Sequence, residues 1–254
     1  MVILFKIVSN IFLGLNGIFF NKYLNIKKKY FLFFDYVKLF LILICVYFFK
    51  IKVTSVKIHS FNYKIFFKNY ITFFYTFNEI FCKCIYKPIK INTFFDLGAN
   101  IGLSILWYKF FNPQLKIVAF EPDRYSFRYL IKNLETNLIT NTKLYNLALS
   151  DKKGETNFYT IIDDIQNLDS GLTLNQNLPY ETYQVSTNIL SSFIIDKIDL
   201  LKMDIEGSEY QVFDDIFRNK KINYFNNIIF EAHYFNLEQK NKKHCRRINK
   251  NWKS

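Results

Sequence analysis

From residue 93 onward, short apolar runs alternate with helical patterns, and this alternation constrains the fold most. Five runs read as buried strands: TFFDLG at 93–98, KIVAFEPD at 116–123, TKLYNLALSD at 142–151, IDLLKMDIEG at 198–207 and NNIIFEAH at 226–233. Helical patterns follow the first two runs, at 100–111 and 124–137. Strands that alternate with helices form a parallel sheet with helices on both faces, so we predict an α/β, doubly wound sheet.

Polar residues and glycines gather where these predicted strands end. The ends carry Asp96, Gly98, Asn100 and Gly102 on the first strand, Glu121 on the second, Ser150 and Asp151 on the third, Asp204, Glu206 and Gly207 on the fourth, and Glu231 and His233 on the fifth. Ligands of doubly wound sheets bind at the carboxyl ends of the strands, near the switch in strand order. The pattern therefore predicts one ligand site. Three of only seven glycines lie in these turns, which indicates backbone conformations that a side chain would block.

The turn after the first strand indicates which nucleotide-like ligand the site takes. Its spacing, Gly98-Ala-Asn-Ile-Gly102, lacks the third glycine of the dinucleotide pattern G-x-G-x-x-G, so an NAD-binding oxidoreductase is disfavoured. Asp96 suits a cationic amino-acid head group, directly or through water, and Glu121 suits the two hydroxyls of a ribose. A nucleoside joined to an amino acid has both groups, and S-adenosylmethionine (SAM) is such a ligand.

Five blocks in this order resemble the FkbM-type SAM-dependent methyltransferases: FFDLGANIGLS, AFEPD, LALSD, LLKMDIEGSEY and IIFEAH. The resemblance covers about residues 75–235. It implies a class I methyltransferase, Rossmann-like fold and O-methylation of a sugar, glycan or related hydroxyl. It also implies that Asp96, Gly98, Asn100 and Gly102 form the SAM loop, that Glu121 holds the ribose, and that the turn from Ala148 to Asp151 lies beside the adenine.

Transfer of a methyl group to a hydroxyl needs alignment of the acceptor and a base that removes its proton. The candidate bases are Asp204, Glu206 and His233. Lys202 alternates with the two carboxylates along the fourth strand, so it either supports their catalytic role or merely neutralises Asp204. His233 is equally suited to a structural hydrogen bond. The carboxylates Asp204, Glu206 and Glu231 would suit Mg²⁺ or Ca²⁺, but we predict no metal.

The sequence departs from the family at two places. An aspartate usually stands where this chain has Ser191, between the third and fourth strands. The family fold has two further strands after the fifth, whereas residues 234–254 are basic and poor in apolar side chains. We therefore expect a sheet truncated after strand five. A catalytically degenerate relative that keeps the fold and SAM binding is the alternative to an active enzyme.

The first third of the chain is apolar, and three arrangements of it fit the sequence. Residues 30–49 are long enough to span a bilayer, but Asp35 and Lys38 interrupt them. We rank helices buried on the main domain first, helices in a membrane interface second, and a spanning helix third. The expected divisions are a helical extension at 1–52, a lead-in of strands and a helix at 53–90, and the methyltransferase domain at 91–254.

Composition and charge restrict the partners and the compartment. The net charge of +13 fits an anionic partner, but we favour surface lysines in an AT-rich coding sequence as its explanation, because the lysines are scattered and no nucleic-acid motif is present. Cys45, Cys82, Cys84 and Cys245 form no disulfide framework, which indicates a reducing compartment. We expect a cytoplasmic protein, in contact with the membrane surface through residues 1–52, whose partner is a small-molecule or glycan acceptor.

Overall fold

The computed structural model describes residues 2–161 and 180–231. The helices are α1 (Val2–Phe20), α2 (Ile26–Phe49), α3 (Tyr70–Phe77), the π-helical turn η1 (Asn78–Cys82), α4 (Leu103–Phe111), α5 (Arg124–Thr136), the 3₁₀ turn η2 (Leu190–Phe193), α6 (Glu209–Arg218) and the 3₁₀ turn η3 (Ile222–Tyr224). The strands are β1 (Ser55–Ile58), β2 (Tyr63–Phe66), β3 (Thr93–Leu97), β4 (Lys116–Phe120), β5 (Thr142–Tyr145), β6 (Ala148–Ser150), β7 (Gly154–Ile161), β8 (Tyr180–Ile189), β9 (Ile198–Met203) and β10 (Phe225–Phe230).

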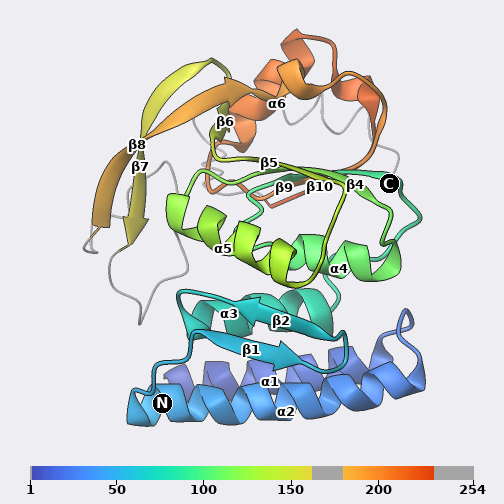
Figure 1. The fold of residues 1–254 in the computed structure, drawn as a ribbon, viewed down its shortest axis with the longest axis vertical. Helices are drawn as coiled ribbons and strands as arrows, with labels where there is room; N and C mark the ends of the chain where they lie inside the picture. Colours follow the sequence, from blue (N-terminus) through green and yellow to red (C-terminus); the bar gives the residue numbers. More distant parts are fainter. Residues whose placement is uncertain (1, 162–179, 232–254) are drawn as a thin grey trace.

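A parallel sheet of five strands forms the centre of the molecule, in the order β10-β9-β3-β4-β5. Helices α4 and α5 cover one face of the sheet and α6 lies on the other side (Figure 1). The order reverses at β3, whose neighbours are the next strand in the chain, β4, and the much later β9. The predicted α/β sheet is confirmed, and its switch point lies between β3 and β9.

The third predicted strand is wrong in its extent. The run from 142 to 151 breaks after Tyr145, and only β5 joins the parallel sheet. The amide of Asn146 donates to the carbonyl oxygens of Glu121 (2.8 Å) and Pro122 (3.1 Å) and turns the chain away. Strand β6 pairs instead with β8, in a separate sheet with β7. Asp151 therefore does not stand at the carboxyl edge of the parallel sheet.

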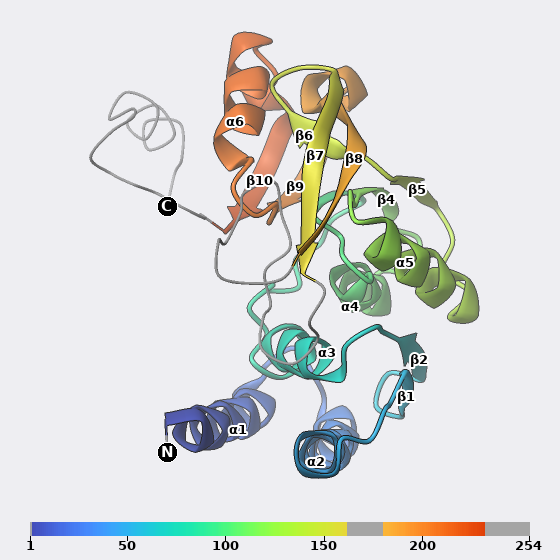
Figure 2. The same ribbon diagram turned by 90° about the vertical axis from the view of Figure 1, so that its left-hand side faces the viewer.

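The first 90 residues form a layer beneath α4 and α5, with α1 and α2 at the base of the molecule (Figures 1 and 2). Residues 1–52 provide two helices, as predicted for the apolar extension. In the predicted lead-in at 53–90, the apolar-polar alternation of residues 53–74 indicates strand pairs, which is right for the hairpin β1-β2 but wrong after Asn69, where α3 begins. The Asn69 side chain accepts from the backbone N–H of Thr72 at 3.0 Å, and this N-cap starts a helix in spite of the apolar-polar alternation.

The N-terminal layer and the sheet share a hydrophobic core. Phe61 from the β1-β2 hairpin lies with its ring 5.0 Å from that of Phe81 in η1 and 6.0 Å from that of Trp107 in α4. One continuous cluster of buried side chains extends from Ile18 to Leu200. The core therefore crosses both sequence positions, 52 and 90, at which we divided the chain. The expectation for residues 234–254 lies outside the described residues.

Candidate active site

A cavity of about 680 Å³ opens at the carboxyl ends of β3, β4 and β9, where the strand order switches. Its volume is that of a small-molecule site. One wall is the loop from β3 to α4 together with the residues that follow β4 and β9. The opposite wall comes from the N-terminal layer, through Asn10, Thr72, Tyr75, Thr76, Glu79 and Tyr86. The sheet and the N-terminal helices therefore enclose the cavity together.

The loop after β3 depends on a glycine at its first position. Gly98 has φ +78°, and a Cβ there would overlap the backbone carbonyl oxygen of Asp204. The N–H groups of Gly98 and Ala99 both donate to the carbonyl oxygen of Phe120, each at 3.0 Å. The loop is thus fastened to β4 and pressed against the end of β9, and Gly98, Ala99 and Asn100 line the cavity. Gly102 begins α4 with φ +90° and lies behind the wall of the cavity.

Glu121 ties the end of β4 to the same loop. Its carboxylate accepts from the backbone N–H of Asn100 at 2.7 Å and from that of Asp123 at 2.8 Å. Burial, with the neighbouring charge of Asp123, raises the pKa of Glu121 to about 8. Each carboxylate oxygen accepts one backbone hydrogen bond and retains capacity for a second, and the side chain lines the cavity.

Asp96 is fully buried and lies behind the loop instead of on the cavity wall. One carboxylate oxygen accepts from the hydroxyl of Ser104 in the first turn of α4. The other lies 3.1 Å from the ammonium nitrogen of Lys202. The structure therefore gives Asp96 a positioning role, in which it holds the start of α4 and Lys202 around the loop.

Lys202 is buried on β9 and connects three parts of the site. Its ammonium donates to the carbonyl oxygen of Gly98 at 3.0 Å and lies 3.8 Å from Oδ2 of Asp204. Burial acts to lower the pKa of Lys202, but nearby groups, led by the Asp96 carboxylate, outweigh burial and raise it above the ordinary value. Lys202 is thus a cation at neutral pH and not a base, and its nearer carboxylate is Asp96, not Asp204 as the strand pattern indicated.

The candidate bases Asp204 and Glu206 both line the cavity. Strand β9 ends at Met203, so both residues belong to the turn that follows, and Glu206 has φ +51°. Glu231, directly after β10, also lines the cavity, whereas His233 lies outside the described residues. Within residues 2–161 and 180–231, no group of three His, Cys, Asp or Glu side chains has an arrangement that could hold a metal ion.

The two residues expected near the adenine separate in the structure. Ala148 lines the cavity, beside Leu147 and Leu149. Asp151 lies in the β6-β7 turn, outside the cavity lining, and accepts from the hydroxyl of Ser150 at 3.2 Å. The separation follows from the break after β5, which redirects this segment into the second sheet.

Among the residues of the site that have no place in the sequence prediction are Glu79, Tyr86 and Ser104. Ser104 is the last residue of the sequence block FFDLGANIGLS, which contains the loop, so the sequence could have pointed to it as a site residue. Glu79 lies on the π-helical turn, and burial raises its pKa, with the charges of Glu231 and Asp204 adding to the effect. Tyr86 is buried with its ring centroid 5.8 Å from the ammonium of Lys202. Neither Glu79 nor Tyr86 has a sequence signal, because only the tertiary packing brings this segment to the sheet.

Ser191, which stands where the family usually has an aspartate, contacts α6. Its hydroxyl donates to Asp215 Oδ1 at 2.6 Å and its backbone N–H donates to Oδ2 at 2.7 Å. Both residues are buried, and neither belongs to the cavity lining. In this structure the departure affects the attachment of α6, not the cavity.

Comparison with known proteins agrees with this geometry. The family model described as the methyltransferase FkbM domain matches residues 96–250, which include the β3-α4 loop, Glu121 and the turn after β9. The chain belongs to the FkbM methyltransferase family. The parallel sheet of five strands, with its switch in strand order, is the doubly wound arrangement that the sequence predicted.

Two curated methyltransferases are relatives at moderate distance. Methyltransferase 1 of Beauveria bassiana is 29% identical over 157 residues, which cover 53% of this chain and 63% of that protein. Methyltransferase sdnD of Sordaria araneosa is 27% identical over 183 residues, which cover 55% of this chain and 70% of that protein. The crystal structure of methyltransferase FkbM from Methylobacillus flagellatus aligns over 57% of this chain and 39% of its own, with 16% identity and a TM-score of 0.36.

Proposed function

We propose that this FkbM-family chain is a SAM-dependent O-methyltransferase that acts on a hydroxyl of a sugar, glycan or related small acceptor. The observation that carries the proposal is the hydrogen bond from Asn100 N–H to Glu121, because it joins the loop and the carboxylate on one wall of the cavity. Asp204 and Glu206 line the same cavity. Cofactor-binding and proton-accepting groups are thus in reach of one another.

The residues present fit SAM. Gly98 lets the loop lie directly against the end of β9, where a Cβ would overlap the Asp204 carbonyl, and Glu121 has acceptor capacity for two ribose hydroxyls. Leu147, Ala148 and Leu149 offer an apolar surface for an adenine. The acidic groups of the cavity suit a cationic amino-acid head group better than a pyrophosphate. When bound, SAM supplies a methyl group activated by its positive sulfur.

The chain itself supplies alignment and a proton acceptor. We assign Asp204 as the general base, because it lines the cavity and follows β9 at the point where its backbone carbonyl lies against Gly98 of the loop. Lys202 holds the Gly98 carbonyl and thereby fixes the loop relative to Asp204. Glu206 and Glu231 orient the acceptor through hydrogen bonds with its hydroxyls.

The wall formed by the N-terminal layer supports a polyhydroxyl acceptor. It carries hydroxyl, amide and carboxylate side chains together with the rings of Tyr75 and Tyr86. Hydroxyl-rich ligands are recognised by several convergent polar groups within an otherwise apolar pocket. Acceptor choice then depends on residues outside the sequence blocks that carry the family resemblance.

Calorimetry and a methyl-transfer assay test this proposal. Titration of the full chain with SAM is expected to give saturable binding, and NAD is expected to give none. Incubation with radiolabelled SAM and glycan extracts is expected to label a hydroxyl-bearing acceptor. Asp204→Asn should abolish labelling with SAM binding nearly unchanged. Asp196→Asn, the same chemical change at an exposed position at the opposite end of β9, should leave both unchanged.

Each alternative has its own outcome. NAD binding without SAM binding would contradict the proposed cofactor. SAM binding without methyl transfer to any acceptor would favour the alternative, in which the chain keeps the fold and SAM binding but has lost catalysis. Unchanged turnover of Asp204→Asn would remove Asp204 as the base and leave Glu206, Glu231 and His233 as the groups to test.

A further inference from the structure

Helix α2 is apolar on two opposite faces, and the described residues cover one of them. Leu32, Tyr36, Leu39 and Leu43 are buried against the rest of the molecule. On the opposite face, Tyr30, Phe34, Leu41 and Phe48 are between 51% and 67% exposed. Their spacing of 4, 7 and 7 residues puts them on one stripe of the helix. A helix that is apolar all round belongs in apolar surroundings on both sides.

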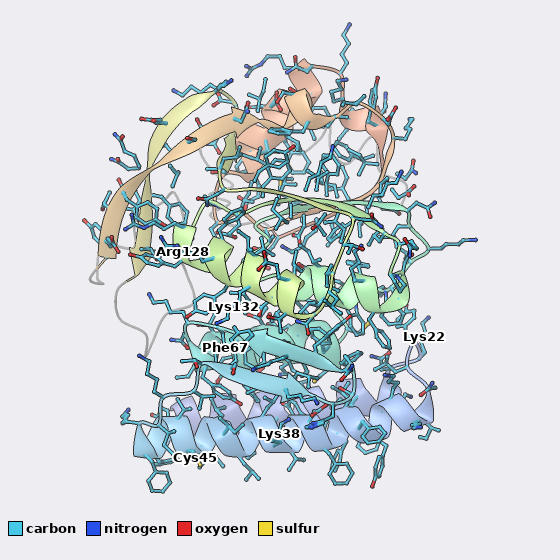
Figure 3. All side chains as sticks on the ribbon, viewed as in Figure 1. Lys22, Lys38, Cys45, Phe67, Arg128 and Lys132 are labelled. Carbon is cyan, nitrogen blue, oxygen red and sulfur yellow. The ribbon has the colours of Figure 1, made fainter. Side chains whose placement is uncertain are left out.

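Helix α1 extends this exposed stripe. Its Phe12 is 65% exposed and its Phe19 62%, and α1 and α2 together form the base layer (Figures 1 and 2). Its other face is held very close to the molecule, because a Cβ on Gly14 would overlap Tyr36 and Asn78. Cys45 points away from the remainder of the molecule on the lower side of α2 (Figure 3). We call the exposed side of α1 and α2 the docking face.

The charges around the docking face have one sign. Lys27 lies in the first turn of α2, Lys50 and Lys52 follow its end, and all three are exposed. Residues 1–52 contain eight lysines and a single acidic residue, Asp35, which is buried on the inner face of α2. An exposed apolar stripe with lysines at both ends is complementary to a bilayer whose headgroups are anionic.

We propose that the docking face lies in the surface of an anionic phospholipid bilayer, with α1 and α2 parallel to the membrane plane. The exposed aromatic rings enter the boundary between headgroups and acyl chains, where such rings are favoured. The lysines remain at the phosphates. This membrane contact goes beyond the proposed methyl transfer and does not depend on it.

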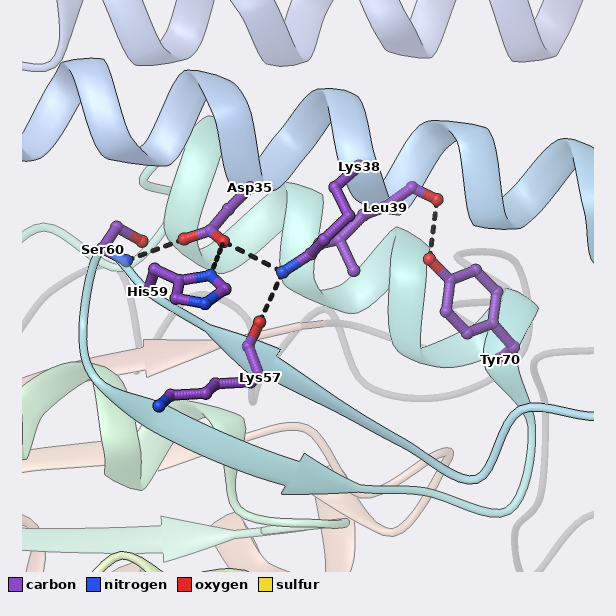
Figure 4. A network of polar contacts seen from close by, with 7 residues as sticks. All are labelled: Asp35, Lys38, Leu39, Lys57, His59, Ser60 and Tyr70. Atoms are coloured by element: carbon purple, nitrogen blue, oxygen red, sulfur yellow. Dashed lines mark hydrogen bonds and ion pairs between the residues drawn. The ribbon is translucent and has the colours of Figure 1, made fainter.

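Side-chain bonds on the inner face of α2 argue against a spanning helix, although α2 is long and apolar enough to cross a membrane. Asp35 accepts from the backbone N–H of Ser60 at 2.7 Å and pairs with Lys38 at 3.1 Å (Figure 4). The hydroxyl of Tyr70 donates to the carbonyl oxygen of Leu39 at 2.6 Å. A spanning α2 would break these contacts and carry Asp35 into hydrocarbon, which is costly.

The charge pattern also argues against a second copy of this chain as the occupant. In a symmetric dimer through the docking face, Lys27 and Lys50 of both copies would lie around one shared interface. Like charges brought together across an interface disfavour association. A bilayer with anionic headgroups removes this repulsion.

Vesicle flotation of the full chain tests the proposal. We expect binding to phosphatidylcholine vesicles that contain phosphatidylserine, and much weaker binding to pure phosphatidylcholine. Phe34→Gln with Phe48→Gln should weaken binding roughly tenfold or more, because apolar area is lost from the interface. The matched control, Leu138→Gln with Ile195→Gln, changes two residues that are 86% and 82% exposed elsewhere and should bind as the parent does.

A second pair of variants tests the lysines without touching the apolar residues. Lys27→Gln and Lys52→Gln should each weaken binding to the anionic vesicles about fivefold. Lys152→Gln and Lys153→Gln, in the β6-β7 turn at the opposite end of the molecule, should have no effect (Figure 1). Bound protein should be released by alkaline carbonate.

Several outcomes would overturn the proposal. One is equal flotation of the variant Phe34→Gln with Phe48→Gln and its control. Another is equally strong binding to vesicles with and without phosphatidylserine. Retention in carbonate-washed membranes would mean that α2 spans. If the protein forms a dimer in solution and the variant Phe34→Gln with Phe48→Gln is monomeric, the docking face is an interface between two copies of the chain.

Discussion

The ammonium nitrogen of Lys202 lies 3.1 Å from Oδ1 of Asp96, and the two residues are direct partners in the register of β9 and β3. Both side chains are buried between β3 and β9, where the strand order of the sheet reverses. Lys202 also holds the carbonyl oxygen of Gly98. The pair therefore links the folding of the central strands to the position of the loop that lines the cavity.

Lys202→Met should destabilise the protein by about 3 to 5 kcal/mol, because it leaves the Asp96 carboxylate buried without its cation. Urea unfolding measures the change. SAM affinity, measured by calorimetry under conditions in which the variant is folded, should fall as well, since the loop loses its bond from Lys202 to Gly98.

The double variant Lys202→Met with Asp96→Leu separates the two effects. With both charges removed, most of the lost unfolding free energy should return. SAM affinity should remain low, because nothing replaces the bond to the Gly98 carbonyl. A single variant as stable as the double variant would contradict the role assigned to the pair.

Gly98→Ala and Gly102→Ala should differ in what they affect. Both residues have left-handed φ angles, so the φ angle alone makes each change cost about 1 to 3 kcal/mol of stability, and the overlap with backbone adds to the cost at Gly98. Only at Gly98 would the new methyl group meet backbone, the carbonyl of Asp204, whereas at Gly102 it meets the side chain of Leu130. Calorimetry should therefore show loss of SAM binding for Gly98→Ala and a smaller change for Gly102→Ala. Equal affinities would refute the steric argument.

The sequence was sufficient to predict the sheet and much of the cavity wall. Buried parallel strands are marked by apolar runs, and their ends by Gly98, Glu121 and Asp204, which are local signals. The switch point follows from topology, so these residues could be predicted to meet.

Other parts of the site depend on packing that leaves no local pattern. The break after Tyr145 follows from bonds between the Asn146 amide and carbonyls beyond β4, which a strand pattern cannot reveal. Asp96 was expected at the ligand, but its neighbours Ser104 and Lys202 draw it behind the loop. The N-terminal wall of the cavity, with Tyr86, exists only because α1 and α3 pack on η1, which in turn contacts α4.

The raised pKa of Glu121 predicts a pH-dependent stability for the ligand-free protein. Because this carboxyl is protonated more readily in the folded state, its stabilising contribution is complete below the ordinary glutamate pKa of 4.5. It is lost as the pH rises through the folded pKa of about 8. Between about pH 6 and pH 9 the unfolding free energy should fall by roughly 2 to 3 kcal/mol from this group alone.

Glu121→Gln provides the matched comparison for that effect. The amide cannot ionise, so the stability difference between parent and variant should narrow or reverse as the pH rises. Denaturant unfolding at several pH values measures the difference, and other titrating groups cancel in it. A difference that stays constant from pH 6 to pH 9 would show that Glu121 is ionised throughout.

Ser191 provides a test of whether its departure from the family affects catalysis or structure. Ser191→Asp, which restores the family residue, should destabilise the protein by about 3 kcal/mol or more, since a second carboxylate would face the buried Asp215. Exchanging the two, as Ser191→Asp with Asp215→Ser, should recover much of that loss, because one carboxylate and one hydroxyl again share the contact. SAM binding should be unchanged in both folded variants, since neither residue lines the cavity. If the single variant instead gained methyl transfer without loss of stability, Ser191 would belong to the acceptor site and its bond to Asp215 would be incidental.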